Sequence, residues 1–432
     1  MHKKRGGTWC CFVFALATSP TQAFAAEYYI EPSVKARYEF DDNRSLSEPA
    51  ESASTWKFSP LVKFGRLTPN SSVTGAARVD VNESNSEAVD STDLFFGLLP
   101  IYRTERSVWG LDATYRRDTT LRTNIFEPDF GQEPLPADSA LAGTDEVTAP
   151  PETAVGTEIP GEDIPDLDDP DQLQDSDIGL RAQEVQRNLL VLSPRWRREL
   201  TPRMGLGLRY RYVDTFYSDA EGTGLVDSRR HSGSADLSYR WSEVDDISVI
   251  TSVQNFQNDE NSEFDTYRFE LGWRHRFSDT LRAVATGGPE YTDEGGSGGG
   301  SDLSYSFRLG VSKRLESSDL DIFFRRAVAP SEDGNALERN QIDVRWLGDI
   351  SPRWSFAFLA RAFRNEDAGD SASGSRDRSY AQVEPTISYA LTENIYVDLG
   401  YRFRWQDTDE SVFAHAVALS VGYRLDRFGF SR

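Results

Sequence analysis

The chain has 432 residues, with 70 Asp and Glu against 47 Lys and Arg, and its formal net charge at pH 7 is -23. This acidity speaks against a nucleic-acid partner, because phosphate backbones are bound by basic surfaces. The mean hydropathy of -0.55 and the lack of any apolar run of about 20 residues exclude a bundle of membrane-spanning helices, but not a membrane barrel, whose strands are only half apolar.

The first 25 residues have the three parts of a secretory signal peptide. Residues 3–5 are basic, residues 9–18 are apolar, and small residues at 23–25 precede a predicted cleavage site before Ala26. Both cysteines of the chain lie inside this segment. We therefore predict an exported mature chain, residues 26–432, that has no disulfide, no thiolate metal site and no cysteine nucleophile.

From Tyr28 onward, apolar and polar residues alternate with the period of two that is typical of β-strands with one apolar and one wet face. The clearest segment is 303–311, where Leu303, Tyr305 and Phe307 alternate with serines and Arg308. About 18 segments of this kind follow one another, and helical periodicity is nearly absent. This pattern predicts an all-β chain.

The connections between these segments alternate between short and long. Tight turns such as 67–70 and 349–352 contain Pro, Asn, Asp and Ser, which favour turns. Short and long connections then fall on opposite rims of one sheet, as in an antiparallel, up-and-down transmembrane β-barrel. A β-propeller would show a repeated motif, and a β-sandwich of this length would show a domain linker. The long connections are predicted at 41–53, 82–91, 119–180, 217–229, 257–263, 292–301, 330–338, 365–378 and 406–411.

The face of each predicted strand that carries arginine must point into the barrel, because an Arg facing lipid at mid-bilayer costs roughly 2–4 kcal/mol. Carboxylates share this inner face, for example Glu39 and Asp343. Two interpretations remain open: the charges pair and fill a narrow wet interior, or they line a pore that attracts anions. The predicted pore-lining residues are Arg209, Arg211, Arg240, Arg268, Arg274, Arg308, Arg345, Arg361, Arg402 and Arg404.

Two further features fit a barrel in a Gram-negative outer membrane. Tryptophans near the strand ends, such as Trp241 and Trp354, are predicted to form interface girdles. The connection 119–180 is strongly acidic and has no Lys or Arg between Arg122 and Arg181, which predicts a flexible, hydrated extracellular loop. Its stretch 163–171 could hold calcium through several carboxylates, but it lacks the pattern of an EF-hand. The loop could also fold back into the arginine-lined lumen as a lid.

A catalytic site is not predicted. A barrel hydrolase would need a histidine near a serine or an aspartate, and the mature chain has only His231, His275 and His415. His275 and His415 fall on the apolar face, so a pair of His231 with Asp236 is the remaining alternative. We predict neither a cofactor nor a metal, and no enzyme activity.

With its signal peptide, regular hairpins, Tyr-Arg alternation at 210–212 and 400–403, and closing strand 412–425, the chain resembles the beta-barrel porin 2 family. The resemblance covers essentially the whole mature chain and implies an association with exopolysaccharide production or export. The arginine-lined lumen is similar in kind to that of the alginate-export barrel. Many such barrels end on Phe or Trp, whereas this chain continues past Phe430 to Ser431 and Arg432.

We therefore predict passive conduction or export of an anionic solute or polysaccharide across the outer membrane, with the lumen arginines as selectivity residues. The alternatives are a non-conducting scaffold barrel of an exopolysaccharide system and a barrel hydrolase. The expected partners are outer-membrane lipid, an anionic polysaccharide, and periplasmic export or assembly proteins.

Overall fold

The computed structural model describes residues 26–85, 90–119, 185–218, 225–259, 263–295, 301–330, 336–367, 377–408 and 411–431. These residues form antiparallel strands rich in aromatic and β-branched side chains, which pack well on a pleated surface. The strands are β1 (Glu27–Asp41), β2 (Ala53–Thr68), β3 (Ser71–Ser84), β4 (Ser91–Arg103), β5 (Ser107–Thr119), β6 (Gln186–Thr201), β7 (Met204–Ser218), β8 (Ser228–Arg240), β9 (Asp245–Asn258), β10 (Glu263–Ser278), β11 (Leu281–Gly295), β12 (Ser301–Arg314), β13 (Ser318–Pro330), β14 (Ala336–Ser351), β15 (Trp354–Asp367), β16 (Arg378–Ala390), β17 (Ile395–Asp407), β18 (Ser411–Arg424) and β19 (Phe428–Ser431).

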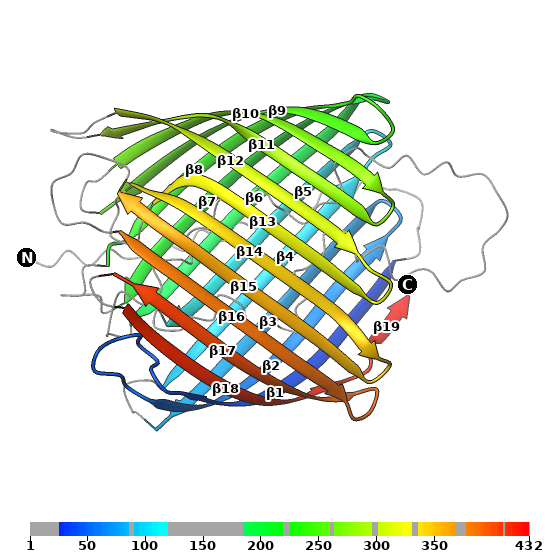
Figure 1. The fold of residues 1–432 in the computed structure, drawn as a ribbon. Helices are drawn as coiled ribbons and strands as arrows, with labels where there is room; N and C mark the ends of the chain where they lie inside the picture. The colour runs from blue at the N-terminus through cyan, green and yellow to red at the C-terminus, as the bar shows by residue number, and fades with distance from the viewer. Residues whose placement is uncertain are drawn as a thin grey trace, which may run out of the picture.

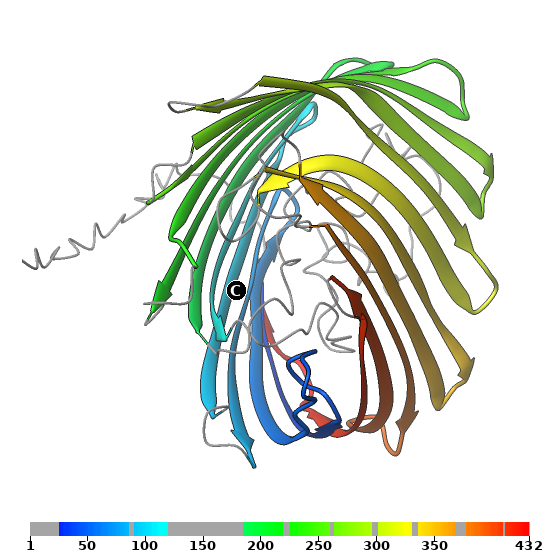
Figure 2. The ribbon, with the colours of Figure 1, turned by 60° about the vertical axis from the view of Figure 1, so that its left-hand side comes forward.

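Strands β1 to β18 form a closed up-and-down barrel. Each strand pairs antiparallel with the next one along the chain, and β18 returns to pair with β1. The strands run diagonally around the barrel axis (Figures 1 and 2). Closure pairs the backbone groups that lipid cannot satisfy. The predicted 18-stranded antiparallel barrel is confirmed, with one additional short strand, β19.

The two rims of the barrel differ in their connections. Every second hairpin, from β2–β3 to β16–β17, has a turn of two to four residues. These turns lie at one rim, together with β19 (Figure 1). Several of these turns are held by a hydroxyl that accepts the backbone N–H three residues later, as Thr68 does from Ser71 and Thr104 from Ser107. The other connections lie at the opposite rim, and all but two of them are longer. The exceptions are 259–262 and 408–410, which were predicted as long connections but have only four and three residues, because the flanking strands extend further than predicted. We call these the tight-turn rim and the long-connection rim.

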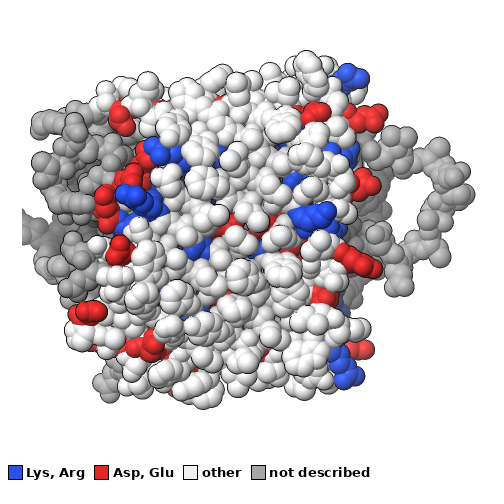
Figure 3. Space-filling model, in the orientation of Figure 1, with Lys and Arg blue, Asp and Glu red and all other residues white. Residues whose placement is uncertain are grey.

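The outer face of the barrel is apolar. Large apolar side chains such as Phe58, Leu271, Leu303 and Leu399 are half or more exposed along the strands. Most of the face in Figure 3 carries no charge, and charged side chains are seen toward its two ends and in a narrow band across its middle. Trp109, which is 52% exposed, and the other exposed tryptophans lie near the strand ends, as the predicted girdle requires. The exposed tryptophans are Trp56, Trp109, Trp241, Trp273, Trp346 and Trp354.

No helix in the part of the chain that the structure describes is long and apolar enough to span a membrane.

The barrel closes with a divided strand. Residues Ser33–Asp41 of β1 pair with β18, whereas residues Glu27–Ile30 pair with β19. At the break, the Leu425 N–H donates to the Pro32 carbonyl at 3.0 Å. The aromatic ring of Phe430 stacks on Tyr28 at a centroid distance of 5.2 Å on the outer face. The predicted closing strand 412–425 therefore corresponds to β18, and the residues after it, which sequence analysis left unassigned, complete the seam.

The charged interior as the candidate functional site

All ten predicted pore-lining arginines lie on the inner face, opposite the exposed apolar side chains of their strands. On β17, for example, Arg402 and Arg404 are buried, whereas Leu399 and Tyr401, which occupy the alternate positions of the strand, are exposed. The same alternation places Arg209 and Arg211 inside, because Leu208 and Tyr210 face outward. Whether these arginines select a solute stays a prediction.

One side of the interior is built from ion pairs, and we call it the paired wall; it comprises the inner faces of β13 to β18 and β1. Arg404 Nη2 donates to Asp41 Oδ2 at 2.5 Å, across 363 positions of sequence. Arg402 lies between Glu39, at 2.6 Å, and Glu384, at 3.7 Å. Since these side chains are nearly all buried, removing one partner would strand a buried charge.

A second cluster of the paired wall centres on Asp343 of β14. Its Oδ1 accepts a hydrogen bond from Arg361 at 2.6 Å, and its Oδ2 accepts one from Arg325 at 2.8 Å. Nearby, Arg345 donates to Asp321, and the side chain of Arg345 is 40% exposed, more than the others. Four arginines singled out from the sequence thus hold carboxylates: Arg345 and Arg361 hold one on the adjacent strand, whereas Arg402 and Arg404 of β17 reach across β18 to β1.

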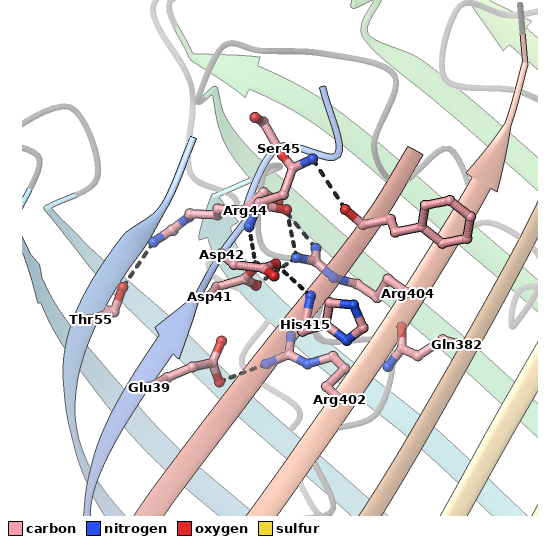
Figure 4. Close-up of polar contacts among 12 residues, drawn as sticks. Glu39, Asp41, Asp42, Arg44, Ser45, Thr55, Gln382, Arg402, Arg404 and His415 are labelled. Carbon is pink, nitrogen blue, oxygen red and sulfur yellow. Dashed lines mark hydrogen bonds and ion pairs between the residues drawn. The ribbon is translucent and has the colours of Figure 1, made fainter. Parts of the chain in front are cut away.

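The connection from β1 to β2 folds into the barrel against the paired wall. Figure 4 shows Arg404 reaching its backbone, where it donates to the carbonyls of Asn43 and Arg44 at 3.1 Å each. The side chain of Leu46, 4% exposed, packs into a cluster with Phe363, Tyr380, Val412 and Ala414. In Figure 2 the blue segment that follows β1 lies inside the ring of strands. Sequence analysis treated 41–53 as an external loop, and its position inside the lumen was not predicted.

The opposite side of the interior, on β6 and β7, is rich in arginine, and we call it the basic wall. Its members are Arg195, Arg197, Arg209 and Arg211, all on inward positions and only partly buried. Arg195 and Arg209 are direct cross-strand partners. The register thus gathers four cationic side chains on one part of the inner face.

The neighbours of the basic wall are small side chains and two inward carboxylates, Asp112 on β5 and Asp236 on β8. The positions opposite Arg209 and Arg211 on β8 are Ser234 and Ser232. On β5, the position opposite Arg195 is Gly110, where an added Cβ would lie 2.8 Å from Arg195 Nε. The glycine therefore leaves the space in which the guanidinium of Arg195 lies. Sequence analysis identified Arg209 and Arg211 as lining residues, but it did not single out Arg197.

The histidines do not form a catalytic group with the aspartate proposed from the sequence. His231 is on the outer face of β8 and its Nδ1 lies 2.7 Å from the hydroxyl of Tyr210, whereas Asp236 is on the inner face of the same strand. His275 is hydrogen-bonded to Asp245, and His415 is hydrogen-bonded to Tyr401. Both histidines lie at outward positions of their strands. The single pair that the hydrolase alternative named is thus divided by the barrel wall.

The predicted signal peptide, 1–25, lies outside the described residues. So does nearly all of the acidic connection 119–180, with its candidate calcium stretch 163–171 and its possible role as a lid. These remain predictions.

A closed 18-stranded barrel with an apolar outer belt and a charged interior defines the class of the protein: it is a Gram-negative outer-membrane β-barrel. No protein-family model matches the sequence, and no curated protein matches it either. The resemblance to the beta-barrel porin 2 family therefore stays a prediction.

Solved structures with a similar fold include Pseudomonas aeruginosa OccK5 (OpdH), at 10% identity and a TM-score of 0.45, with 92% of this chain and 98% of that chain covered. The outer membrane protein OpdK of Pseudomonas aeruginosa is 12% identical, with coverage of 93% and 99% and a TM-score of 0.46. Acinetobacter baumannii OccAB4 is 9% identical, with coverage of 95% and 100% and a TM-score of 0.47. The fold assignment rests on the strand pairing described above.

Proposed function

We propose that the protein is an outer-membrane porin that conducts an anionic solute, with the basic wall as the surface that attracts it. The observation that carries the proposal is the direct cross-strand pairing of Arg195 with Arg209, flanked by Arg197 and Arg211. Guanidinium groups gathered on one part of the inner face raise the local concentration of an anion in the lumen.

The placement of the two rims supports the orientation expected of such a channel. In outer-membrane barrels the short turns face the periplasm and the longer loops face outward. The tight-turn rim, with Glu27 and β19, is then periplasmic, and the β1–β2 connection narrows the lumen from the external side. An anionic polysaccharide is the larger candidate substrate, and the periplasmic export or assembly proteins implied by the family resemblance are the corresponding partners.

The proposal is tested by recording the purified mature protein in planar bilayers under a KCl gradient. The reversal potential should show preference for chloride over potassium. The double variant R195A/R209A should lower the permeability ratio of chloride to potassium several-fold, because two charges leave the lumen. Arg66→Ala is the matched control, since Arg66 is exposed on an outward position of β2, and it should leave the ratio unchanged. A cation preference in the unaltered protein would refute the proposal.

A non-conducting scaffold barrel is the second candidate, and one observation favours it. The paired wall and the inward-folded β1–β2 connection already fill part of the lumen with side chains that satisfy one another. If the same recording showed no conductance at all, the scaffold function would be supported and the porin function refuted.

A further inference from the structure

The wall between β12 and β13 is closed along only part of its height. Residues 307–314 of β12 pair with residues 319–326 of β13. Toward the long-connection rim, β12 extends to Ser301 along β11, and β13 extends to Pro330 along β14. Within the part of the chain that the structure describes, residues 301–306 have no strand partner on the side of β13. We call residues 327–330 of β13 and 336–338 of β14 the hairpin end.

The hairpin end lies inside the barrel, against the inner faces of β9 and β10. Val328 and Ala336 occupy positions that alternation assigns to the outer faces of β13 and β14. Both are nevertheless buried in a cluster with Phe256 and Phe264, which are inward residues of β9 and β10. The side of the hairpin end that would face lipid therefore packs on the lumen side of the neighbouring wall. In Figure 2 the yellow end of β13 diverges from β12 toward the middle of the barrel mouth.

Polar contacts hold the hairpin end in this position. The Val328 N–H donates to Glu290 Oε1 of β11 at 2.8 Å, and the Val328 carbonyl accepts a hydrogen bond from Arg268 of β10 at 2.7 Å. Glu290 is fully buried and also pairs with Arg268. These two side chains replace the strand partner that β12 would otherwise give to Val328. Because a buried carboxylate is costly without a cation, Arg268 is central to this arrangement.

The sequence also fits a second position, in which β13 continues its pairing with β12. The register that sets Phe307 opposite Arg326 places Tyr305 opposite Val328 when it is extended without a shift. Tyr305 is 53% exposed and Leu303 is 73% exposed on the outer face, so Val328 would join an apolar surface that faces lipid. The unpaired edge of β12 would gain its missing partners, which a membrane environment favours.

We propose that the hairpin end is a gate with two positions, the inward one of this structure and an outward one paired with β12. Each position satisfies the backbone of Val328, through Glu290 and Arg268 in the first case and through β12 in the second. Each also suits the side chains of Val328 and Ala336, because apolar groups can pack on the inner cluster or face hydrocarbon. Two packings of one segment with such similar contacts make a bistable element.

The gate sets the width of the lumen near the long-connection rim. The β1–β2 connection narrows the lumen from the side of the paired wall, and the hairpin end narrows it from the side of β9 and β10. The two elements approach each other at Phe363 of β15. Its ring shares a cluster with Leu46 of the connection and lies 4.4 Å from the guanidinium of Arg339, which follows the hairpin end. The effect on solute flow rests on the proposed function, whereas the movement itself does not.

The first test traps the outward position with a disulfide. The chain from residue 26 on has no cysteine, so an engineered pair meets no competing thiol. In Y305C/V328C the two thiols are cross-strand partners only in the outward position, because in the inward one Val328 is buried on the lumen side and Tyr305 is exposed outside. V311C/I322C is the matched control, since Val311 and Ile322 are already direct partners on the same face of the same ladder.

Both variants are oxidised in lipid vesicles with copper phenanthroline, and the disulfide is read by mass spectrometry. Both pairs should cross-link, and the Y305C/V328C disulfide should raise single-channel conductance roughly twofold, because one of the two elements that narrow the lumen is withdrawn. Reduction should reverse the rise. Cross-linking of V311C/I322C alone, or an unchanged conductance in a cross-linked Y305C/V328C channel, would overturn the gate. Cross-linking in a barrel that conducts no ions would support the two positions and refute the proposed porin.

The second test leaves the hairpin end unaltered and weakens its inward contacts. Arg268→Ala removes the donor to the Val328 carbonyl and the cation beside the buried Glu290, and both losses affect only the inward position. The time spent at a high conductance level, relative to a low one, should rise about tenfold, since a hydrogen bond to a charged group shifts a two-state equilibrium by this order.

Arg276→Ala is the matched control for the second test. Arg276 is on the same strand and also donates to a backbone carbonyl, that of Glu243 at 2.6 Å, but it does so near the tight-turn rim. The ratio of the two levels should therefore stay that of the unaltered protein. A single conductance level in both the unaltered protein and R268A would overturn the gate. Both tests count only protein with the gel mobility of the folded barrel, and each one decides alone if the variants of the other fail to fold.

Discussion

The paired wall and the basic wall use the same residue, arginine, in opposite ways. On the paired wall, Arg402 pairs with Glu39 and Arg404 pairs with Asp41, and both carboxylates lie near the end of β1. On the basic wall Arg195 faces Arg209, with serine and glycine as further neighbours. The difference lies in the residue that the register places directly opposite, and we propose that the first wall mainly stabilises the barrel while the second attracts a solute.

Removing Arg404 should produce the largest loss of stability. Arg404→Ala leaves the buried Asp41 carboxylate and the carbonyls of Asn43 and Arg44 without their donor. Breaking a buried ion pair costs about 3–5 kcal/mol in the free energy of unfolding. Urea unfolding of the barrel in lipid vesicles, followed by tryptophan fluorescence, measures the loss. A loss below about 1 kcal/mol, similar to that of Arg66→Ala, would contradict the structural role of this wall.

Overfilling the cluster around Leu46 should have the next largest effect. Ala414 is 0% exposed on the inner face of β18, so Ala414→Leu forces the β1–β2 connection away from the wall. Overpacking of this kind costs about 1–3 kcal/mol. The displaced connection should also raise single-channel conductance, which planar-bilayer recording measures. Ala360→Leu, on the lipid-facing side of β15, is the control and should change neither quantity. A lower conductance in A414L would show that the connection does not narrow the lumen.

The Arg345–Asp321 pair should be weaker than the rest of the paired wall. The side chain of Arg345 is 40% exposed, so water screens the pair, and Arg345→Ala should cost only about 1 kcal/mol. The same unfolding measurement as for Arg404→Ala allows a direct ranking of the two variants. If Arg345→Ala cost as much as Arg404→Ala, burial would not be the property that sets the strength of these pairs.

Reversing one charge on the basic wall should give the smallest change in stability. In Arg209→Asp the carboxylate lies opposite Arg195, and an opposite-charge cross-strand pair contributes about 0.2–1 kcal/mol. The basic wall then resembles the paired wall, so chloride preference should fall with little change in stability. A destabilised variant with intact chloride preference would remove the distinction between the two walls.

The fold could be predicted from the sequence because alternation fixes both the strand and its orientation. The segment 303–311 lies within β12, and its leucine, tyrosine and phenylalanine face outward as expected. Since the side-chain period is two, each inward arginine follows from the outward residues beside it. Alternation within a strand does not show which side chains meet when strands distant in the sequence come together at the closure of the barrel. The pairing of Arg404 with Asp41 could therefore not be predicted.

Other features escaped prediction for identifiable reasons. The β1–β2 connection has the composition of an external loop, and only the small inner residues of β18, from Ala414 to Ala418, indicate that something else fills the lumen there. Strand β19 has four residues, too few for a periodic pattern. The pairing of β12 with β13 ends at Phe307, although the alternation of β12 continues beyond it. Alternation within one strand therefore does not show where its pairing with the next strand stops.

The divided seam also brings the two ends of the described chain together, because Glu27 of β1 is the cross-strand partner of Ser431 of β19. Adjacent strands lie about 5 Å apart, so a few added residues could join these ends without disturbing any strand. Every tight turn is then an equivalent place to open the chain. The order in which the strands are synthesised is therefore separable from their order around the wall, and circularly permuted barrels could show which hairpin assembly requires first.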